Sequence, residues 1–127
     1  MKIDLTNEMI EMESGPNLYF MGSIPDYIKL KKVFFDLSQG ENSEVMLDDI
    51  FNELISSPVE VVFRSKKGGA ILSKIKDGNV LMELDFQLWK RIALMVCPLS
   101  EKKAHCYVEF DDLDLRDDCN VIMSSEW

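Results

Sequence analysis

The periodicity of the chain changes at Pro58, and this change constrains the fold more than any other feature of the sequence. Within Asn42–Ser57 the apolar residues recur at helical spacing, and Ser43 is a suitable N-cap. After Pro58 the pattern becomes that of β-strands, with β-branched and aromatic residues in short runs. The sequence therefore predicts one main amphipathic helix, over about residues 43–56, followed by a sheet.

Most of the chain after Pro58 is divided into short segments with strand composition. Ala70–Lys76 and Val80–Phe86 are joined through Asp77-Gly78, a dipeptide typical of a tight hairpin turn. Strands are also predicted at Val59–Arg64, Ile92–Cys97, His105–Phe110 and Cys119–Ser124. Polar loops separate the last three of these segments, so we expect an antiparallel sheet.

The first third of the chain allows two interpretations. Leu18–Met21 has the composition of a strand. In Tyr27–Leu37, polar Lys29 and Lys31 alternate with apolar neighbours, which favours a half-exposed strand. The same region begins with a capping-box pattern at residues 23–26, and its apolar residues also fit one helical face. We expect a strand, with a helix over residues 24–38 as the alternative.

Length and apolar content predict a single globular domain over residues 1–127. Apolar residues make up 46% of the chain, which is enough for a core despite a formal net charge of -9. The expected fold class is α+β, with an antiparallel sheet of about six to eight strands and one main amphipathic helix.

Cysteine use and the apolar runs predict a cytoplasmic protein without a membrane span. Cys97, Cys106 and Cys119 are odd in number and lack CxxC spacing, as is typical of reduced thiols. The first eight residues carry acids where a signal peptide needs an apolar stretch. The longest apolar run, Ile92–Leu99, is far shorter than the ~20 residues that cross a bilayer.

Two acidic sets dominate the charge pattern. Five aspartates fall within eight residues near the C-terminus, and only Arg116 offsets them. A second set lies on the predicted helix, where like charges three or four residues apart destabilise by about 0.2–0.5 kcal/mol per pair. Such unpaired charge can serve solubility, pair with the basic strands of the same chain or meet a cationic partner, and we expect the partner. The candidate partner-binding residues are Asp111, Asp112, Asp114, Asp117, Asp118, Glu44, Asp48, Asp49 and Glu53.

Catalytic, metal and cofactor signatures are weak in this sequence. His105 is the only histidine and has no nucleophile motif around it. The adjacent His105 and Cys106 would point to opposite faces of a strand, and paired zinc knuckles are missing. The aspartate run has Arg116 where a calcium loop needs an oxygen ligand. We therefore expect no enzyme activity, no metal and no cofactor.

A single-stranded nucleic-acid binding module is the alternative function. Residues 64–103 hold 9 bases and 4 acids, whereas residues 1–63 hold 4 bases and 12 acids and residues 104–127 hold 1 base and 7 acids. Basic strands with aromatic residues can track phosphates and stack bases. The acidic total argues against this function, and the aromatic residues are also suited to a core. The residues concerned are Arg64, Lys66, Lys67, Lys74, Lys76, Lys90 and Arg91, with Phe63, Phe86 and Trp89.

In its size, acidity, predicted helix and strands, lack of catalytic motifs and cysteine pattern, the chain resembles immunity proteins of bacterial toxin systems, such as those paired with contact-dependent growth inhibition toxins. The resemblance covers the general character of the whole chain and no diagnostic motif. It implies a cytoplasmic inhibitor that binds a cognate toxin domain, commonly a nuclease, and occludes its basic cleft. On this interpretation Trp89 or Trp127 supplies an aromatic anchor. The oligomeric state stays open.

Overall fold

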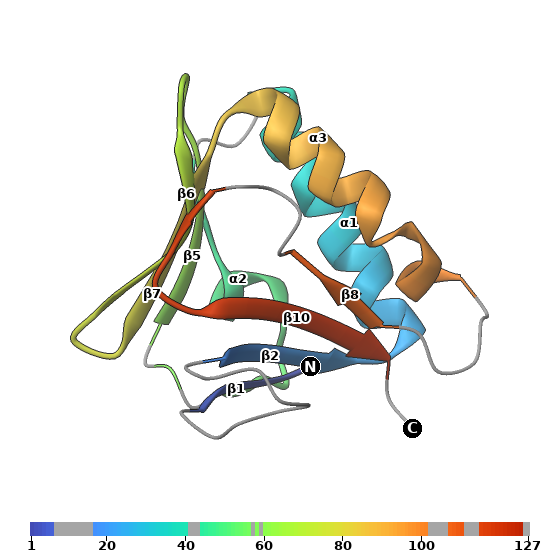
Figure 1. The fold of residues 1–127 in the computed structure, drawn as a ribbon. Helices are drawn as coiled ribbons and strands as arrows, with labels where there is room; N and C mark the ends of the chain where they lie inside the picture. Colours follow the sequence, from blue (N-terminus) through green and yellow to red (C-terminus); the bar gives the residue numbers. More distant parts are fainter. Residues whose placement is uncertain are drawn as a thin grey trace.

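The computed structural model describes residues 1–6, 17–40, 44–56, 58, 60–101, 107–110 and 115–125, and for Thr6, Arg116 and Asp117 it describes the backbone alone. Two five-stranded sheets and two helices, α1 (Ile24–Ser38) and α3 (Phe86–Met95), surround the core. In Figure 1 the second sheet stands at the left, the first lies along the bottom, and the helices form the third side. The predicted α+β class is confirmed.

The first sheet brings the two ends of the described chain together. Its strand order is β4-β1-β2-β10-β8. β2 pairs antiparallel with β1 and parallel with β10, so that Leu18 lies between Leu5 and Val121. The strands are β1 (Lys2–Thr6), β2 (Asn17–Gly22), β4 (Ile55–Ser56), β8 (Tyr107–Glu109) and β10 (Asn120–Ser125).

The second sheet has the order β3-β5-β7-β6-β9. β7 lies between β5 and β6, parallel to the first and antiparallel to the second. Asp77 and Gly78, both with positive φ, make the tight turn between β6 and β7. The strands are β3 (Glu44–Met46), β5 (Glu60–Ser65), β6 (Ala70–Lys76), β7 (Asn79–Leu84) and β9 (Arg116–Asp117).

Most predicted strands are confirmed, but the single antiparallel sheet is only partly matched. The hairpin and the strands predicted at residues 18–21, 59–64 and 119–124 correspond to elements of the structure, and β8 lies within residues 105–110. The described residues form ten strands in two mixed sheets instead of six to eight in one. β2–β10 and β5–β7 are parallel pairs that join segments distant in sequence.

The strand expected at Tyr27–Leu37 is wrong, and the alternative helix is correct. Ser23 and Asp26 form a capping box, in which each side chain accepts a hydrogen bond from the backbone of the other residue. Buried Tyr27 is followed by Leu30, Phe34 and Leu37, also buried, at three- and four-residue spacing. The lysines that suggested alternation lie on the exposed and partly exposed sides of this helix.

The helix predicted over residues 43–56 is also wrong in its extent. The segment contains β3, a single helical turn α2 (Leu47–Ile50), and β4. Glu44 and Met46 pair with Arg64 and Val62 of β5, so strand pairing with a distant segment overrides the local helical pattern. The main helix of the protein is α1.

The strand predicted at Ile92–Cys97 is wrong because this segment continues α3 into a short 3-10 turn, η1 (Cys97–Ser100). Asp85 caps the helix by accepting a hydrogen bond from the backbone N–H of Leu88 at 3.0 Å. Trp89, Ile92, Ala93 and Val96 are buried at helical spacing. The apolar run is therefore one side of a helix in the core.

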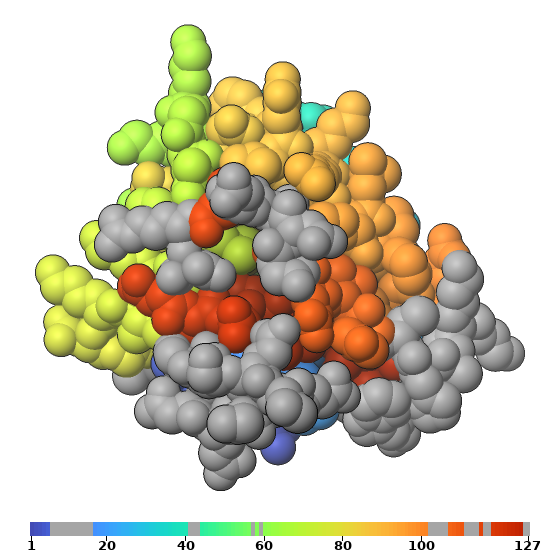
Figure 2. All heavy atoms as spheres, viewed as in Figure 1, coloured from blue at the N-terminus to red at the C-terminus, as the bar shows by residue number. Residues whose placement is uncertain are grey.

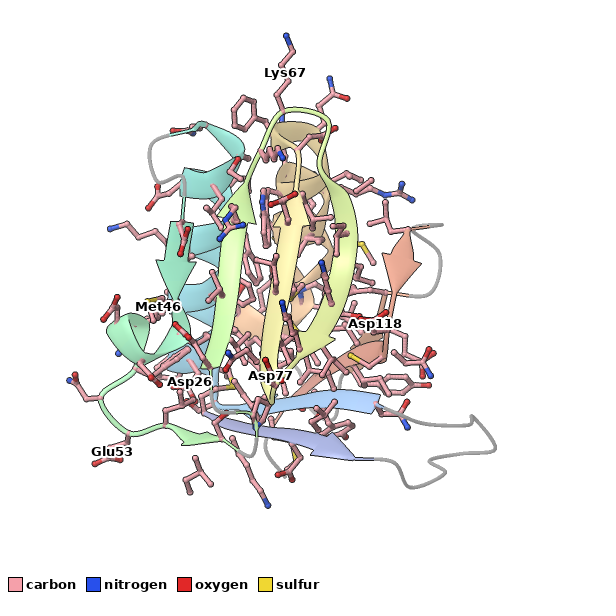
Figure 3. The ribbon with its side chains drawn as sticks, turned by 90° about the vertical axis from the view of Figure 1, so that its left-hand side faces the viewer. Asp26, Met46, Glu53, Lys67, Asp77 and Asp118 are labelled. Atoms are coloured by element: carbon pink, nitrogen blue, oxygen red, sulfur yellow. The ribbon has the colours of Figure 1, made fainter. Side chains whose placement is uncertain are left out.

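Three aromatic residues join the helices to the second sheet. The rings of Phe34 and Trp89 stack with centroids 5.5 Å apart, and Phe63 of β5 meets both rings edge-on. Trp89 Nε1 donates to the carbonyl of Arg64 at 2.9 Å. Each such aromatic pair adds about 0.5–1.5 kcal/mol beyond the burial of its area. The helices are thus held on one side of the sheet, and its other side faces the viewer in Figure 3.

Candidate protein-binding surface

The side of the second sheet that faces away from the helices is called here the open face. Its residues alternate along β5 and β7 with core residues such as Phe63 and Met82. Strand register lines its side chains up in rows, and all of them are exposed or partly exposed. The open face consists of Glu44, Met46, Glu60, Val62, Arg64, Ile71, Lys74, Lys76, Asn79, Leu81 and Glu83.

A shallow groove of about 490 Å³ crosses the open face. Partly buried Val62 and Leu81 lie side by side in its middle. The face carries three acids and three bases, so its net charge is close to zero. Its apolar centre and polar rim are the usual arrangement in a protein interface. Glu60, Val62 and Leu81 are not among the contact residues predicted from charge, although their alternation with core residues is visible in the sequence.

Glu44, predicted as a free contact residue, is engaged within the open face. Its Oε2 accepts a hydrogen bond from Arg64 Nε at 3.2 Å, and Arg64 Nη1 lies 3.2 Å from Glu83. The hydrogen bond to Glu83 raises the pKa of the Arg64 guanidinium, burial opposes that rise, and Glu44 adds to it. Lys66 lies 3.9 Å from Glu83. Part of the predicted acidic set therefore neutralises the basic strands of the same chain.

Asp48 and Asp49 lie at the β3 edge of the open face. They belong to α2, which follows β3 directly and is anchored by buried Leu47 and Phe51. Both side chains are exposed, and neither forms an ion pair with any residue in the described ranges. Their charge is therefore available to a partner.

Glu53 is exposed but lies apart from these two aspartates. It lines a hollow of about 440 Å³ with Asn52, Phe51, Lys29 and the start of α1. Figure 3 shows it below the sheet, on the loop that leads to β4. The four acids of the predicted helix are thus not one stripe, because the helix that would align them is a single turn.

Asp118 lies at the opposite edge of the open face. Its Oδ2 accepts a hydrogen bond from the backbone N–H of Ile75 at 2.9 Å, and its own N–H donates to the carbonyl of Ser73 at 2.9 Å. Asp117 is in β9, which pairs with β6. Asp111, Asp112 and Asp114 lie outside the described residues. The C-terminal end of the predicted acidic loop is therefore fixed on β6.

Two members of each acidic set lie at the edges of one sheet, Asp48 and Asp49 beside β3, and Asp117 and Asp118 at β9. Figure 3 shows Met46, at the start of α2, on the left and Asp118 on the right, with β5, β7 and β6 between them. Four inter-strand spacings of about 4.8 Å separate β3 from β9, or about 19 Å. The charge pattern of the sequence predicts both sets, but their positions at opposite edges of one sheet follow from the strand order.

The predicted nucleic-acid surface is not assembled as expected. Phe63 and Trp89 are buried in the core, and of the three aromatics only Phe86 is exposed. Arg64 and Lys66 contact Glu83. Lys74 and Lys76 lie on the open face beside the acids, whereas Lys90 and Arg91 are on the outer side of α3.

Other functional features are few in the part of the chain that the structure describes. No three side chains of His, Cys, Asp or Glu there lie together as metal ligands would. No helix there is long and apolar enough to cross a membrane. Cys97 is partly buried and Cys119 is buried, whereas His105, Cys106 and Trp127 fall outside the described residues.

Comparison with known proteins gives no assignment. No protein-family model matches the chain, and no curated protein or solved structure matches it significantly.

Proposed function

We propose that this chain is an acidic inhibitor, an immunity protein of the cytoplasm that binds a cognate toxin domain over the open face of the second sheet. The observation that carries the proposal is the position of Asp48 and Asp49 at one edge of a partly apolar sheet face and of Asp117 and Asp118 at the other. A partner seated on Val62 and Leu81 would reach Asp48 and Asp49 at one edge and Asp118 at the other.

The dimensions of the face support a single interface. A standard interface covers about 800 Å² on each partner, a patch about 30 Å across, which exceeds the about 19 Å between the edge strands. Both acidic edges therefore fit under one partner domain.

The charge distribution supports a cationic partner such as a nuclease domain with a basic cleft. Acids at the rim speed association and fix register, while the neutral apolar centre excludes water. Occupation of the cleft by a folded inhibitor blocks substrate without chemistry, in keeping with the expected absence of enzyme activity.

Charge reversal within each predicted acidic set tests the proposal. The partner to use is the cationic domain encoded by a neighbouring gene, if it co-purifies with this protein. We expect the D48K/D49K and D111K/D112K/D114K variants each to weaken the affinity by about tenfold or more, with little change in melting temperature. Affinity equal to wild type in both variants would remove the two edges from the interface.

Reversal of bases on the open face is the matched control. The K74E/K76E variant adds acid to the same surface, so a cationic partner should bind it as tightly as wild type or more tightly. A partner that binds through phosphates would instead lose affinity for this variant. The sign of the change separates the proposal from the nucleic-acid alternative.

A further inference from the structure

The outer side of α1 carries cations that form no ion pair within the described part of the chain. Lys29 and Lys32 are exposed, and neither forms an ion pair with any residue that the structure describes. The Lys29 ammonium lies over the ring of Phe51, 5.8 Å from its centroid, which orients it toward the α2 segment. Asp36 lies one turn beyond Lys32 and is partly buried.

An exposed aliphatic side chain lies on the same side of the helix. Ile28 is 51% exposed and, at three- and four-residue spacing in a helix, shares this side with Lys32 and Pro25. We call Ile28, Lys29 and Lys32 the basic stripe. Figure 1 shows the helix layer as an outer side of the molecule, and in Figure 2 the atoms of α3 form much of the upper right surface.

The basic stripe adjoins an acidic region. Lys29 lines one wall of the 440 Å³ hollow, and Asn52 and Glu53 line another. Phe51 lies under the Lys29 ammonium, and Asp48 and Asp49 precede it by three and two residues. We call Asp48 and Asp49 of α2, together with Glu53 of the loop that follows it, the acidic turn. The stripe and the turn meet at the hollow through Lys29 and Glu53, and the two aspartates lie four and five residues before Glu53.

Two adjoining surfaces of opposite charge are self-complementary. A two-fold axis through their boundary sets the basic stripe of one copy against the acidic turn of the other, twice over, and two-fold dimers are the commonest protein oligomers. We propose that a second copy of this chain docks there and forms a weak homodimer across the hollow, with the Ile28 side chains covered. This inference does not depend on the proposed toxin partner.

The dimer would cover Asp48 and Asp49, which the proposed function assigns to the partner. Self-association and partner binding should therefore exclude each other. In the dimer, the basic stripe of the second copy occupies the site of the cationic partner and binds more weakly than that partner does.

Sedimentation or light scattering of the protein alone tests the proposal across the micromolar to millimolar range. Wild type should shift reversibly from monomer to dimer. K29E/K32E and D48K/D49K/E53K should each weaken dimerisation about tenfold or more. D48K/D49K/E53K brings the net charge closer to zero, so the loss of general repulsion between copies would strengthen dimerisation of this variant. Weaker dimerisation of this variant therefore indicates loss of the local contact.

Mixing the two variants gives the sharpest result. In a heterodimer the acidified stripe of one variant meets the basic turn of the other at one contact, and the unchanged turn and stripe meet at the second contact. Both contacts are then attractive, so the mixture should dimerise while each variant alone stays monomeric. K74E/K76E, with the same charge change as K29E/K32E but on the open face, should dimerise as wild type does. Neutral variants K29Q/K32Q and D48N/D49N/E53Q, expected to weaken association less, replace any reversal that fails to fold.

Three outcomes overturn the proposal. Wild type that stays monomeric throughout the range leaves no dimer to explain. Stripe and turn variants that dimerise as wild type does show that the interface lies elsewhere. A mixture that stays monomeric although both variants are folded rules out the paired contact.

Discussion

Glu44 of β3 accepts a hydrogen bond from Arg64 of β5 across strands that are 20 residues apart in sequence. This ion pair converts one of the acids expected to meet a partner into a link between the edge strand and its neighbour. It also answers in part whether the acidic residues meet a cation of another protein or of the same sheet. For Glu44 the cation is Arg64.

Glutamine substitution should distinguish the two carboxylates around Arg64. Glu44→Gln removes an exposed pair and should lower the free energy of unfolding by about 0.2–1 kcal/mol. Glu83→Gln should lower the free energy of unfolding by more, about 1–2 kcal/mol, because the Glu83 side chain is only 13% exposed and contacts both Arg64 and Lys66. Urea unfolding measures both, and an equal or reversed order would contradict the assigned roles.

Ser73 should matter more to stability than a surface serine. Its buried hydroxyl accepts from the backbone N–H groups of Asp118 and Cys119 at 3.1 Å and donates to the carbonyl of Cys119 at 2.9 Å. Ser73→Ala removes three hydrogen bonds made by one buried hydroxyl and should cost about 1–3 kcal/mol in urea unfolding. The control is Ser65→Ala, which removes a single hydrogen bond to Leu37 and should cost less.

Asp26 should contribute to stability in a pH-dependent way. Burial alone would raise the pKa of Asp26, but hydrogen bonds from Ser23 and the nearby amino group of Met1 together hold the pKa below its ordinary value of 3.8. The folded state therefore favours the ionised form, and its contribution is fully present well above pH 3.8 and lost as pH falls through the lower folded pKa.

Asp26→Asn should remove that dependence. The difference in unfolding free energy between wild type and variant should be largest near neutral pH and shrink as pH falls below 3.8. Urea unfolding across this range measures it. A difference that grows as the solution becomes more acidic would show that the pKa is raised instead.

Single-stranded oligonucleotides should not bind appreciably even at low salt. Phe63 and Trp89 are buried, so they cannot stack on bases, and Arg64 and Lys66 are held by Glu83. Fluorescence anisotropy with labelled oligonucleotides measures this. Binding that falls steeply with salt and is lost in K74E/K76E would favour the nucleic-acid function.

Local patterns predicted the local parts of the fold. The β6–β7 hairpin follows from Asp77-Gly78 between alternating strands, and β2, β5 and β10 follow from their composition. The capping box at Ser23 and Asp26 predicts the helix that forms, whereas the alternating lysines favour a strand, which does not form. At α3 the apolar run from Ile92 suggested a strand, although Asp85 is a good N-cap for a helix that begins earlier.

Non-local pairing explains the other errors. The helical pattern after Ser43 is real over one turn, but Glu44–Met46 gains more by pairing with β5. The same pairing places Asp48 and Asp49 at one edge of the second sheet, while contacts of Asp118 with Ser73 and Ile75 fix the other edge. No local pattern encodes strand order, so the relation between the acidic sets could not be predicted.

The most direct test of the central claim is titration calorimetry with the co-purified cationic domain and charge-reversal variants of both acidic sets. The account predicts that D48K/D49K and D111K/D112K/D114K each weaken binding about tenfold or more, that the combined variant binds more weakly than either, and that K74E/K76E binds at least as tightly as wild type. Affinity that is unchanged in the combined variant, or lost in K74E/K76E, would contradict it.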